Sequence, residues 1–304
     1  MKANNTTLHH VELKRIFIYL AIVFGVYYGL WFIAVILPSN AGKSIYSLLS
    51  FPAVFMGTPA FAVFITRKIT SDKSPLKFSA KVWKNKKALL FSAFVPAAAI
   101  FCGTAIFFLI FPNDLDFSGK YISKTYGAFG APSDISFTVF SMLRMGTIIY
   151  IISAVCFPVW FIALGEDIGW QGYLMPLLCK RFPVRCAVLL NGALWGMAHA
   201  PLICFGMNYG DDYIGAPISG IAMMVLVCVV LGIWSSYVTL KYNNCMYAAI
   251  IHGASDIIGE AGVWISLSTK STLLGPNPTG IIGMSVLLLG DSILLVKLPN
   301  GKLH

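Results

Sequence analysis

The sequence predicts an all-α, polytopic integral membrane protein of about eight transmembrane helices. Of its 304 residues, 58% are hydrophobic and 11% are charged, whereas a soluble domain usually carries about 25% charged residues. Apolar runs of about 20 residues, enough to cross a hydrocarbon core of about 30 Å, recur along the chain. The basic residues behind the net charge of +10 lie mainly in short segments between these runs. We therefore expect the lipid bilayer as a partner, and no nucleic acid.

Eight apolar segments define the expected helices. They cover residues 16–37, 45–66, 88–112, 146–164, 187–205, 217–240, 246–264 and 280–296. The fourth, fifth and seventh are short or interrupted by polar residues, which is typical of helices that face a protein interior. The first has an apolar stretch of about 22 residues, longer than the 7–15 residues of a signal-peptide core, so we interpret it as a retained anchor.

The basic residues predict the orientation. With the N-terminus in the cytoplasm, the lysines and arginines gather in the cytoplasmic segments, and the exceptions are Lys43, Lys120, Lys124, Arg144 and Lys270. This asymmetry favours an even number of spans, with both termini cytoplasmic in a cell membrane protein. The seven cysteines are scattered and form no CxxC pair, so they indicate neither a disulfide framework nor a thiolate metal site.

Three regions follow from this pattern. Residues 1–145 hold the first spans and a basic cytoplasmic loop at 67–87, residues 146–265 hold the interrupted spans and the expected catalytic core, and residues 266–304 hold the last span and a cytoplasmic tail. Residues 145–179 contain no lysine or arginine. As one helix they would extend about 52 Å at 1.5 Å per residue, so we expect a bend, at Pro158 or Gly165.

Ionisable side chains lie in or directly against the three short spans. A charge at the bilayer centre costs about 2.5–3.5 kcal/mol or more unless it is paired, so such residues are functional candidates. Glu166-Asp167 is followed by Trp170, one helical turn after Glu166. A carboxylate beside an aromatic ring in a dry site suits a general base, although an interfacial acidic pair facing water would have the same sequence.

Two histidines complete the candidate site. His199 lies one turn after Trp195 among small residues, a pattern that allows close helix packing and that also fits a core histidine. His252 lies one turn before Asp256, so we expect that carboxylate to orient the imidazole, or both to hold a metal or a water. Helix rise places Glu166, His199 and His252 at depths that allow a shared cavity between helices of the C-terminal half.

In order and spacing, these motifs resemble the CAAX-protease and bacteriocin-processing family of intramembrane peptidases, which includes type II CAAX prenyl endopeptidases. The resemblance covers about residues 150–260, and the family is built on eight helices. It matches Glu166 to the Glu of the first motif, His199 to the His behind an aromatic residue, and His252 to the His of the third motif. The resemblance thus implies a membrane-embedded endopeptidase.

Three positions depart from the family pattern. Asp167 replaces a second Glu, Gln171 stands near an expected Arg, and Asp256 stands where Asn is usual. The loss of one positive charge and the gain of one negative charge shift the site toward cation binding. Two histidines and a carboxylate with an open position could hold a divalent metal such as zinc, with His199, His252 and Glu166 as ligands. No HExxH motif is present, which excludes a zincin arrangement.

The sequence therefore favours hydrolysis of a peptide bond in a membrane-associated or lipidated peptide or protein. Glu166 would activate a water, His199 and His252 would position it and stabilise the oxyanion, and Asp256 would orient His252. Asp167, Trp170, Gln171 and Trp195 would support them. One alternative is a non-catalytic membrane scaffold or bacteriocin-immunity protein. Another is a transporter that uses the buried acids and histidines as a proton relay.

Overall fold

The computed structural model describes residues 2–117, 158–267 and 269–302. Within these ranges the chain is helical, and its only β-type pairing is an isolated bridge between Leu115 and Ser266. An all-α membrane protein is thus confirmed for the described part. The fourth expected span, at 146–164, lies mostly outside the described residues, as do the region boundary at 145–146 and Lys120, Lys124 and Arg144.

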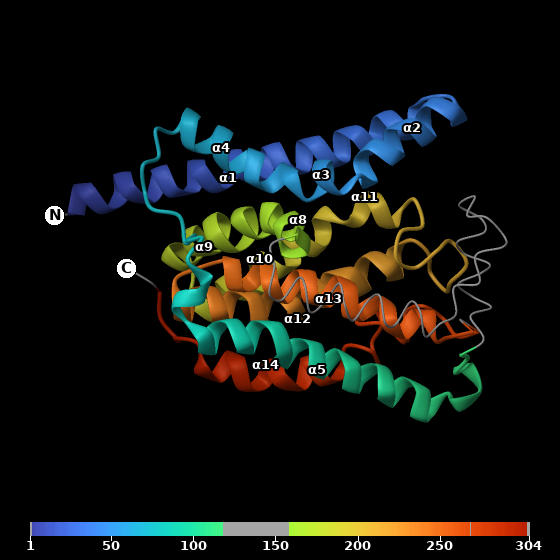
Figure 1. The fold of residues 1–304 in the computed structure, drawn as a ribbon. Coiled ribbons are helices and arrows are strands. Elements are labelled where there is room, and N and C mark those ends of the chain that lie inside the picture. Colours follow the sequence, from blue (N-terminus) through green and yellow to red (C-terminus); the bar gives the residue numbers. More distant parts are fainter. Residues whose placement is uncertain (1, 118–157, 268, 303–304) are drawn as a thin grey trace.

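The helices form an elongated bundle (Figure 1). Along one edge run α1 (Lys2–Ile36), α2 (Ser39–Ser50), α3 (Pro52–Phe55) and α4 (Gly57–Ile69). The middle contains α8 (Pro158–Asp167), the π-helix η3 (Ile168–Leu174), α9 (Met175–Arg181), α10 (Val184–Ala198), α11 (Ala200–Ile203), α12 (Ile218–Tyr242) and α13 (Met246–Trp264). The opposite edge holds α5 (Lys86–Ile110) and α14 (Ser285–Lys297), and η1 (Val82–Lys84) and η2 (Pro112–Asp114) flank α5.

Four described segments are long and apolar enough to cross a membrane: His10–Ile36, Lys86–Ile110, Val184–Ile203 and Ile218–Tyr242. A fifth would be the pair Ser39–Ser50 and Ala53–Ile69, bent by 63°. These segments correspond to the first, third, fifth, sixth and second expected spans. The seventh expected span is a helix with the expected bounds, and the eighth is a helix of 13 residues, but neither meets the same test. The total of eight spans therefore stays a prediction.

Both termini lie at the same end of the bundle (Figure 1), as an even number of crossings requires, while the side of the membrane they face stays a prediction. The basic loop crosses this end and is held to it. The backbone of Lys77 bonds to Gly172 and to Cys245, with N–O distances of 3.3 Å and 2.7 Å. Ser79 and Asn244 are joined by two hydrogen bonds of 2.9 Å. The loop thus ties η3 to the α12–α13 turn.

Asp72 is the charged residue that fixes the start of this loop. Its carboxylate lies 3.1 Å from the guanidinium of Arg15 and accepts hydrogen bonds from the backbone and hydroxyl of Ser74. Burial raises the pKa of Asp72, but the Ser74 hydrogen bonds and the positive charges of Arg15 and Arg67 outweigh burial and lower it overall. The folded state therefore favours the ionised carboxylate.

Asp72→Asn should lower the melting temperature (Tm) at pH 7. Because the pKa is lower in the folded protein than the unfolded value of about 3.9, the stabilisation by Asp72 is complete above that value and is lost as the pH falls through the folded pKa. In detergent, the Tm of Asp72→Asn should lie below that of wild type by a constant amount between pH 7 and about pH 5. Below about pH 4 this difference in Tm should become smaller. A difference that persists unchanged at pH 3 would contradict this. Exposed Asp212→Asn is the matched control.

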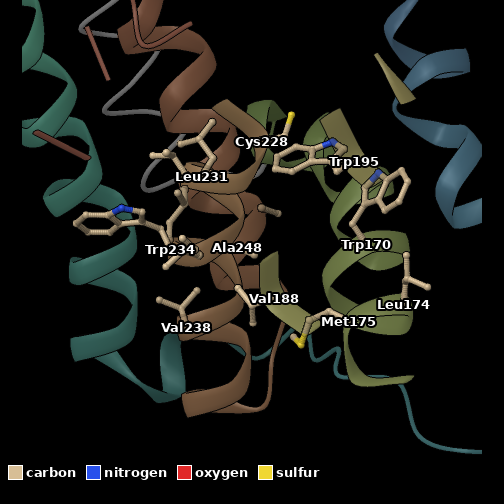
Figure 2. Packing of buried hydrophobic residues seen from close by; sticks show 14 of the residues in the cluster. Trp170, Leu174, Met175, Val188, Trp195, Cys228, Leu231, Trp234, Val238 and Ala248 are labelled. Atoms are coloured by element: carbon tan, nitrogen blue, oxygen red, sulfur yellow. The ribbon is translucent and has the colours of Figure 1, made fainter. Parts of the chain in front are cut away.

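The centre of the bundle is a large apolar cluster that runs from α8 and η3 through α10 to α12 and α13. Figure 2 shows Trp170, Trp195, Leu231 and Ala248 as part of this packing. Within this centre α10 packs closely against α12, where Gly192 and Gly196 face the α12 backbone. A Cβ at Gly196 would lie 2.4 Å from Cα of Val225. The small residues expected to allow close helix approach therefore do so.

Gly196→Ala should destabilise the protein by about 1–3 kcal/mol, because the added methyl meets backbone and the helices must separate. Gly25→Ala is the matched control: it adds the same methyl to α1, where a Cβ meets nothing within 4 Å. Thermal unfolding in detergent micelles should show a lower Tm for Gly196→Ala and an unchanged or slightly higher Tm for Gly25→Ala. Equal melting temperatures for the two variants would show that α10 and α12 do not need a glycine at position 196 for their packing.

Candidate active site

A cavity of about 310 Å³ lies between α8, α10, α12 and α13, and the break between α2 and α4 also reaches it. Among the described residues, the polar and charged side chains that line it include Glu166, Trp195, His199, His252, Asp256 and Glu260. Glu166, His199 and His252, which come from three separate segments of sequence, thus meet in one cavity. Most of the remaining wall is apolar, with Met224, Val227 and Leu231 on α12.

Glu166 lies at the end of α8 and is 1% exposed. Its Oε1 accepts a hydrogen bond of 3.2 Å from the indole nitrogen of Trp195. Its Oε2 has no hydrogen-bond partner among the described residues and lies 3.7 Å from Nε2 of His252. One oxygen is therefore fixed in position, while the other remains able to accept a proton.

Close packing explains why Glu166 is buried. A Cβ at Gly165 would lie 2.4 Å from the carbonyl oxygen of Met56, and one at Gly169 would lie 2.4 Å from Cβ of Pro59. We expected Gly165 to mark a bend, but α8 continues through it, and the change of helix type comes at η3. Such π turns are often found at functional sites.

His252 is 6% exposed and contacts three carboxylates. Its Nδ1 lies 3.1 Å from Oδ2 of Asp167, and its Nε2 lies 3.7 Å from Glu166 and 3.8 Å from Oδ2 of Asp256. The orienting role that we expected for Asp256 is therefore corrected, because Asp167 makes the hydrogen bond. Asp256 is one turn away on the same helix, and its side chain is 48% exposed toward the cavity.

His199 lies at the C-terminal end of α10, and its Nδ1 donates to the carbonyl of Trp195, 3.0 Å away. Since a carbonyl can only accept, this bond places the proton on Nδ1 and leaves Nε2 as the acceptor of the neutral ring. The ring packs against Phe55, with centroids 4.9 Å apart. The Trp195 indole, whose nitrogen bonds Glu166, lies edge-on to His252 at 5.1 Å.

Trp170 and Gln171, two of the expected supporting residues, lie outside the cavity lining, and so does Asp167 behind His252. Trp170 packs edge-on against Tyr19 at 5.8 Å, and Oε1 of Gln171 accepts a hydrogen bond of 2.8 Å from Ser236. We placed Trp170 beside Glu166 by α-helical spacing, but both supporting residues fall in η3, whose wider i→i+5 turn changes the direction of the side chains. Trp195, from another helix, takes the place beside Glu166.

The expected metal ligands do not form a metal site as they stand. No group of three or more His, Cys, Asp or Glu side chains is arranged to hold a metal ion within the described ranges. His199 and His252 each hydrogen-bond through Nδ1, toward Trp195 and Asp167, which leaves Nε2 of each ring available. The metal-ligand role of Glu166, His199 and His252 therefore stays a prediction.

Some cavity residues were missed in the sequence. Glu260 continues the one-turn spacing of His252 and Asp256 along the same face of α13, so this spacing could have revealed it. Phe55 and Asn277 come from segments far from the motifs, and Asn208 lies in the turn that follows α11, and none of these segments carries a signal of that kind.

Fold and site together define a polytopic helical membrane protein with a carboxylate and imidazole cavity suited to activating water. Residues 148–258 match the family model described as type II CAAX prenyl endopeptidase Rce1-like. The chain is also similar to "CAAX prenyl protease 2" of Methanococcus maripaludis, with 23% identity over 236 residues that cover 77% of this chain and 79% of the relative. Both findings support the CAAX protease family, so the resemblance inferred from the motifs is confirmed.

Proposed function

We propose that this protein is an endopeptidase that hydrolyses a peptide bond of a lipidated, membrane-associated peptide, with Glu166 as the general base. The observation that carries the proposal is that Glu166, His199 and His252 line one cavity. Similarity to the CAAX protease family supports the reaction class. The prenyl group in the description of the family and in the name of the relative suggests the lipid.

Glu166 and His199 would hold the attacking water. Oε2 of Glu166 and Nε2 of His199 are both acceptors, so one water can donate a hydrogen to each and direct its lone pair at the carbonyl carbon. The water oxygen forms the new C–O bond while its proton passes to Glu166. The C–N bond then breaks, and Glu166 returns the proton to the leaving amine.

His252 would stabilise the oxyanion. The hydrogen bond to Asp167 fixes the ring, so that Nε2 points toward Glu166 and Asp256. In its imidazolium form the ring donates from Nε2 to the negative oxygen that develops in the transition state. Trp195 has a positioning role, since its indole holds Oε1 of Glu166. No step in this scheme passes through a metal ion.

Mass spectrometry of products tests the proposal. Wild-type protein in proteoliposomes should convert a farnesylated peptide that ends in a CAAX sequence into two fragments with one new carboxyl and one new amino terminus. The peptide should stay intact in liposomes without protein. If no farnesylated, geranylgeranylated or unmodified peptide is cut, the endopeptidase proposal fails and the non-catalytic immunity alternative gains support.

A further inference from the structure

The lining of the cavity extends toward the end of the bundle opposite the two termini, which we call the far end. α13 begins at the turn that is tied to the basic loop and runs away from it, so that His252 precedes Glu260 in that direction. Eight residues of α-helix rise about 12 Å, and Glu260 therefore lies well beyond His252. Asn208 and Asn277 also line the cavity. They belong to the connections after α11 and before α14, which lie at the far end (Figure 1).

Exposure of the lining residues rises in the same direction. Glu166 is 1% exposed and His252 is 6% exposed. In contrast, the side chain of Asp256 is 48% exposed, and Asn208 and Glu260 are exposed. An amide and a carboxylate at the rim favour an opening to water, because either group is costly against lipid. Among the described residues, the cavity therefore opens at the far end.

Packed side chains close the cavity toward the termini. From Glu166, η3 and α9 lead toward the terminus end, and their side chains Trp170, Leu174 and Met175 are almost fully buried (Figure 2). Beyond them the basic loop crosses this end, where the backbone of Lys77 bonds to η3 and to the α12–α13 turn. Within the described ranges, no residue of this loop or of α9 lines the cavity. A peptide could enter from the terminus end only by separating these elements.

Charge indicates which side of the membrane each end faces. The terminus end carries the basic loop at 67–87, whose lysines are mostly exposed. At the far end, the basic residues that the structure describes are Lys43 and Lys270, and Asp211 and Asp212 are exposed there. Short loops rich in lysine and arginine stay on the cytoplasmic side of a membrane. The far end, with the opening of the cavity, is therefore expected to face away from the cytoplasm.

We propose that the cavity receives its substrate from the side of the membrane opposite the termini and the basic loop, outside the cytoplasm. The inference rests on the proposed endopeptidase function and adds the substrate class: an exported, membrane-anchored peptide that is cut after it has crossed the membrane. A peptide held at the cytoplasmic surface would not reach Glu166, because η3, α9 and the basic loop lie between them.

Labelling of introduced cysteines tests on which side the cavity opens. Cells that express Glu260→Cys, at the rim, receive a membrane-impermeant maleimide, and mass spectrometry assigns the label to each cysteine. Glu260→Cys should be labelled in intact cells, as should Asp212→Cys, the matched control at the far end outside the cavity lining. Lys84→Cys in the basic loop should be labelled only after the membrane is permeabilised. Labelling of Lys84→Cys in intact cells, or of Glu260→Cys only in permeabilised cells or not at all, would overturn the inference.

Cleavage in oriented vesicles tests the substrate class. A farnesylated peptide made membrane-impermeant by a sulfonated dye is added to right-side-out or inverted membrane vesicles that contain the protein. Right-side-out vesicles should cut it, inverted vesicles should cut it only after detergent opens them, and vesicles with Glu166→Gln protein should cut it in neither form. Equal cleavage by both intact forms, or faster cleavage by the inverted form, would contradict the proposed side. If no vesicle cuts the peptide even in detergent, the endopeptidase function fails, whereas the labelling pattern still decides where the cavity opens.

Discussion

Replacing Glu166 with glutamine should lower kcat/KM for cleavage of a farnesylated peptide by about 10³- to 10⁴-fold, as loss of a general base does. The amide keeps the size of the side chain, and its oxygen can still accept from the Trp195 indole, but it cannot take a proton from water. The measurement is initial rates in proteoliposomes, together with Tm. Because the buried carboxylate is replaced by a neutral group, Tm should stay the same or rise.

Glu12→Gln is the matched control for this substitution. Glu12 lies on α1, outside the cavity lining, and its ion pair with Lys180 spans 3.4 Å. This variant should keep wild-type kcat/KM, since a partly exposed ion pair contributes about 0–1 kcal/mol to stability and nothing to the chemistry. Wild-type activity in Glu166→Gln would remove Glu166 from the mechanism.

Replacing His252 with alanine should lower kcat by about 10²- to 10³-fold with a smaller change in KM, because the ring acts on charge that develops in the transition state. The structure also ranks its carboxylate neighbours. Asp167→Asn should lower kcat more than Asp256→Asn, since Asp167 holds Nδ1 at 3.1 Å whereas the nearest oxygen of Asp256 is 3.8 Å from Nε2. The same proteoliposome rates provide the comparison.

The opposite ranking, with Asp256→Asn the more damaging variant, would restore the orienting role that the sequence suggested for Asp256. Equal activity of His252→Ala and wild type would exclude His252 from oxyanion stabilisation. In either case, near-ultraviolet circular dichroism must show that the packing around Trp195, whose ring lies 5.1 Å from that of His252, is unchanged.

The main site residues could be predicted from the sequence because an ionisable side chain in a bilayer costs free energy. Glu166, His199 and His252 lie in or directly against apolar segments, where an ionisable group destabilises the protein unless it is paired, and is therefore a functional candidate. The same reasoning gave the bounds of α13, which the structure shares. The helical periodicity of the sequence could not predict which side chains hydrogen-bond to one another in the site. The hydrogen bond from His252 to Asp167 joins residues far apart in sequence, and only tertiary packing brings them together.

Local geometry explains the misplaced supporting residues. Trp170 was placed beside Glu166 by an i,i+4 rule that holds for α-helices, but it falls in a π-helix and packs on Tyr19. Nothing in the composition of this segment distinguishes a π turn from an α turn. The basic loop shows a similar limit. Its lysines predict a charged surface, but not the backbone bonds by which Lys77 ties η3 to the α12–α13 turn.

A peptide substrate should occupy the cavity where Glu166, His199 and His252 meet. Photo-crosslinking can locate it, with a farnesylated peptide that carries a benzophenone next to the cleaved bond and Glu166→Gln protein to prevent turnover. Mass spectrometry should find the adducts on the cavity-lining parts of α12 and α13, around Val227, Leu231 and Ser255. Adducts confined to α5, α14 or the lipid-facing side of α1 would show that the peptide binds elsewhere.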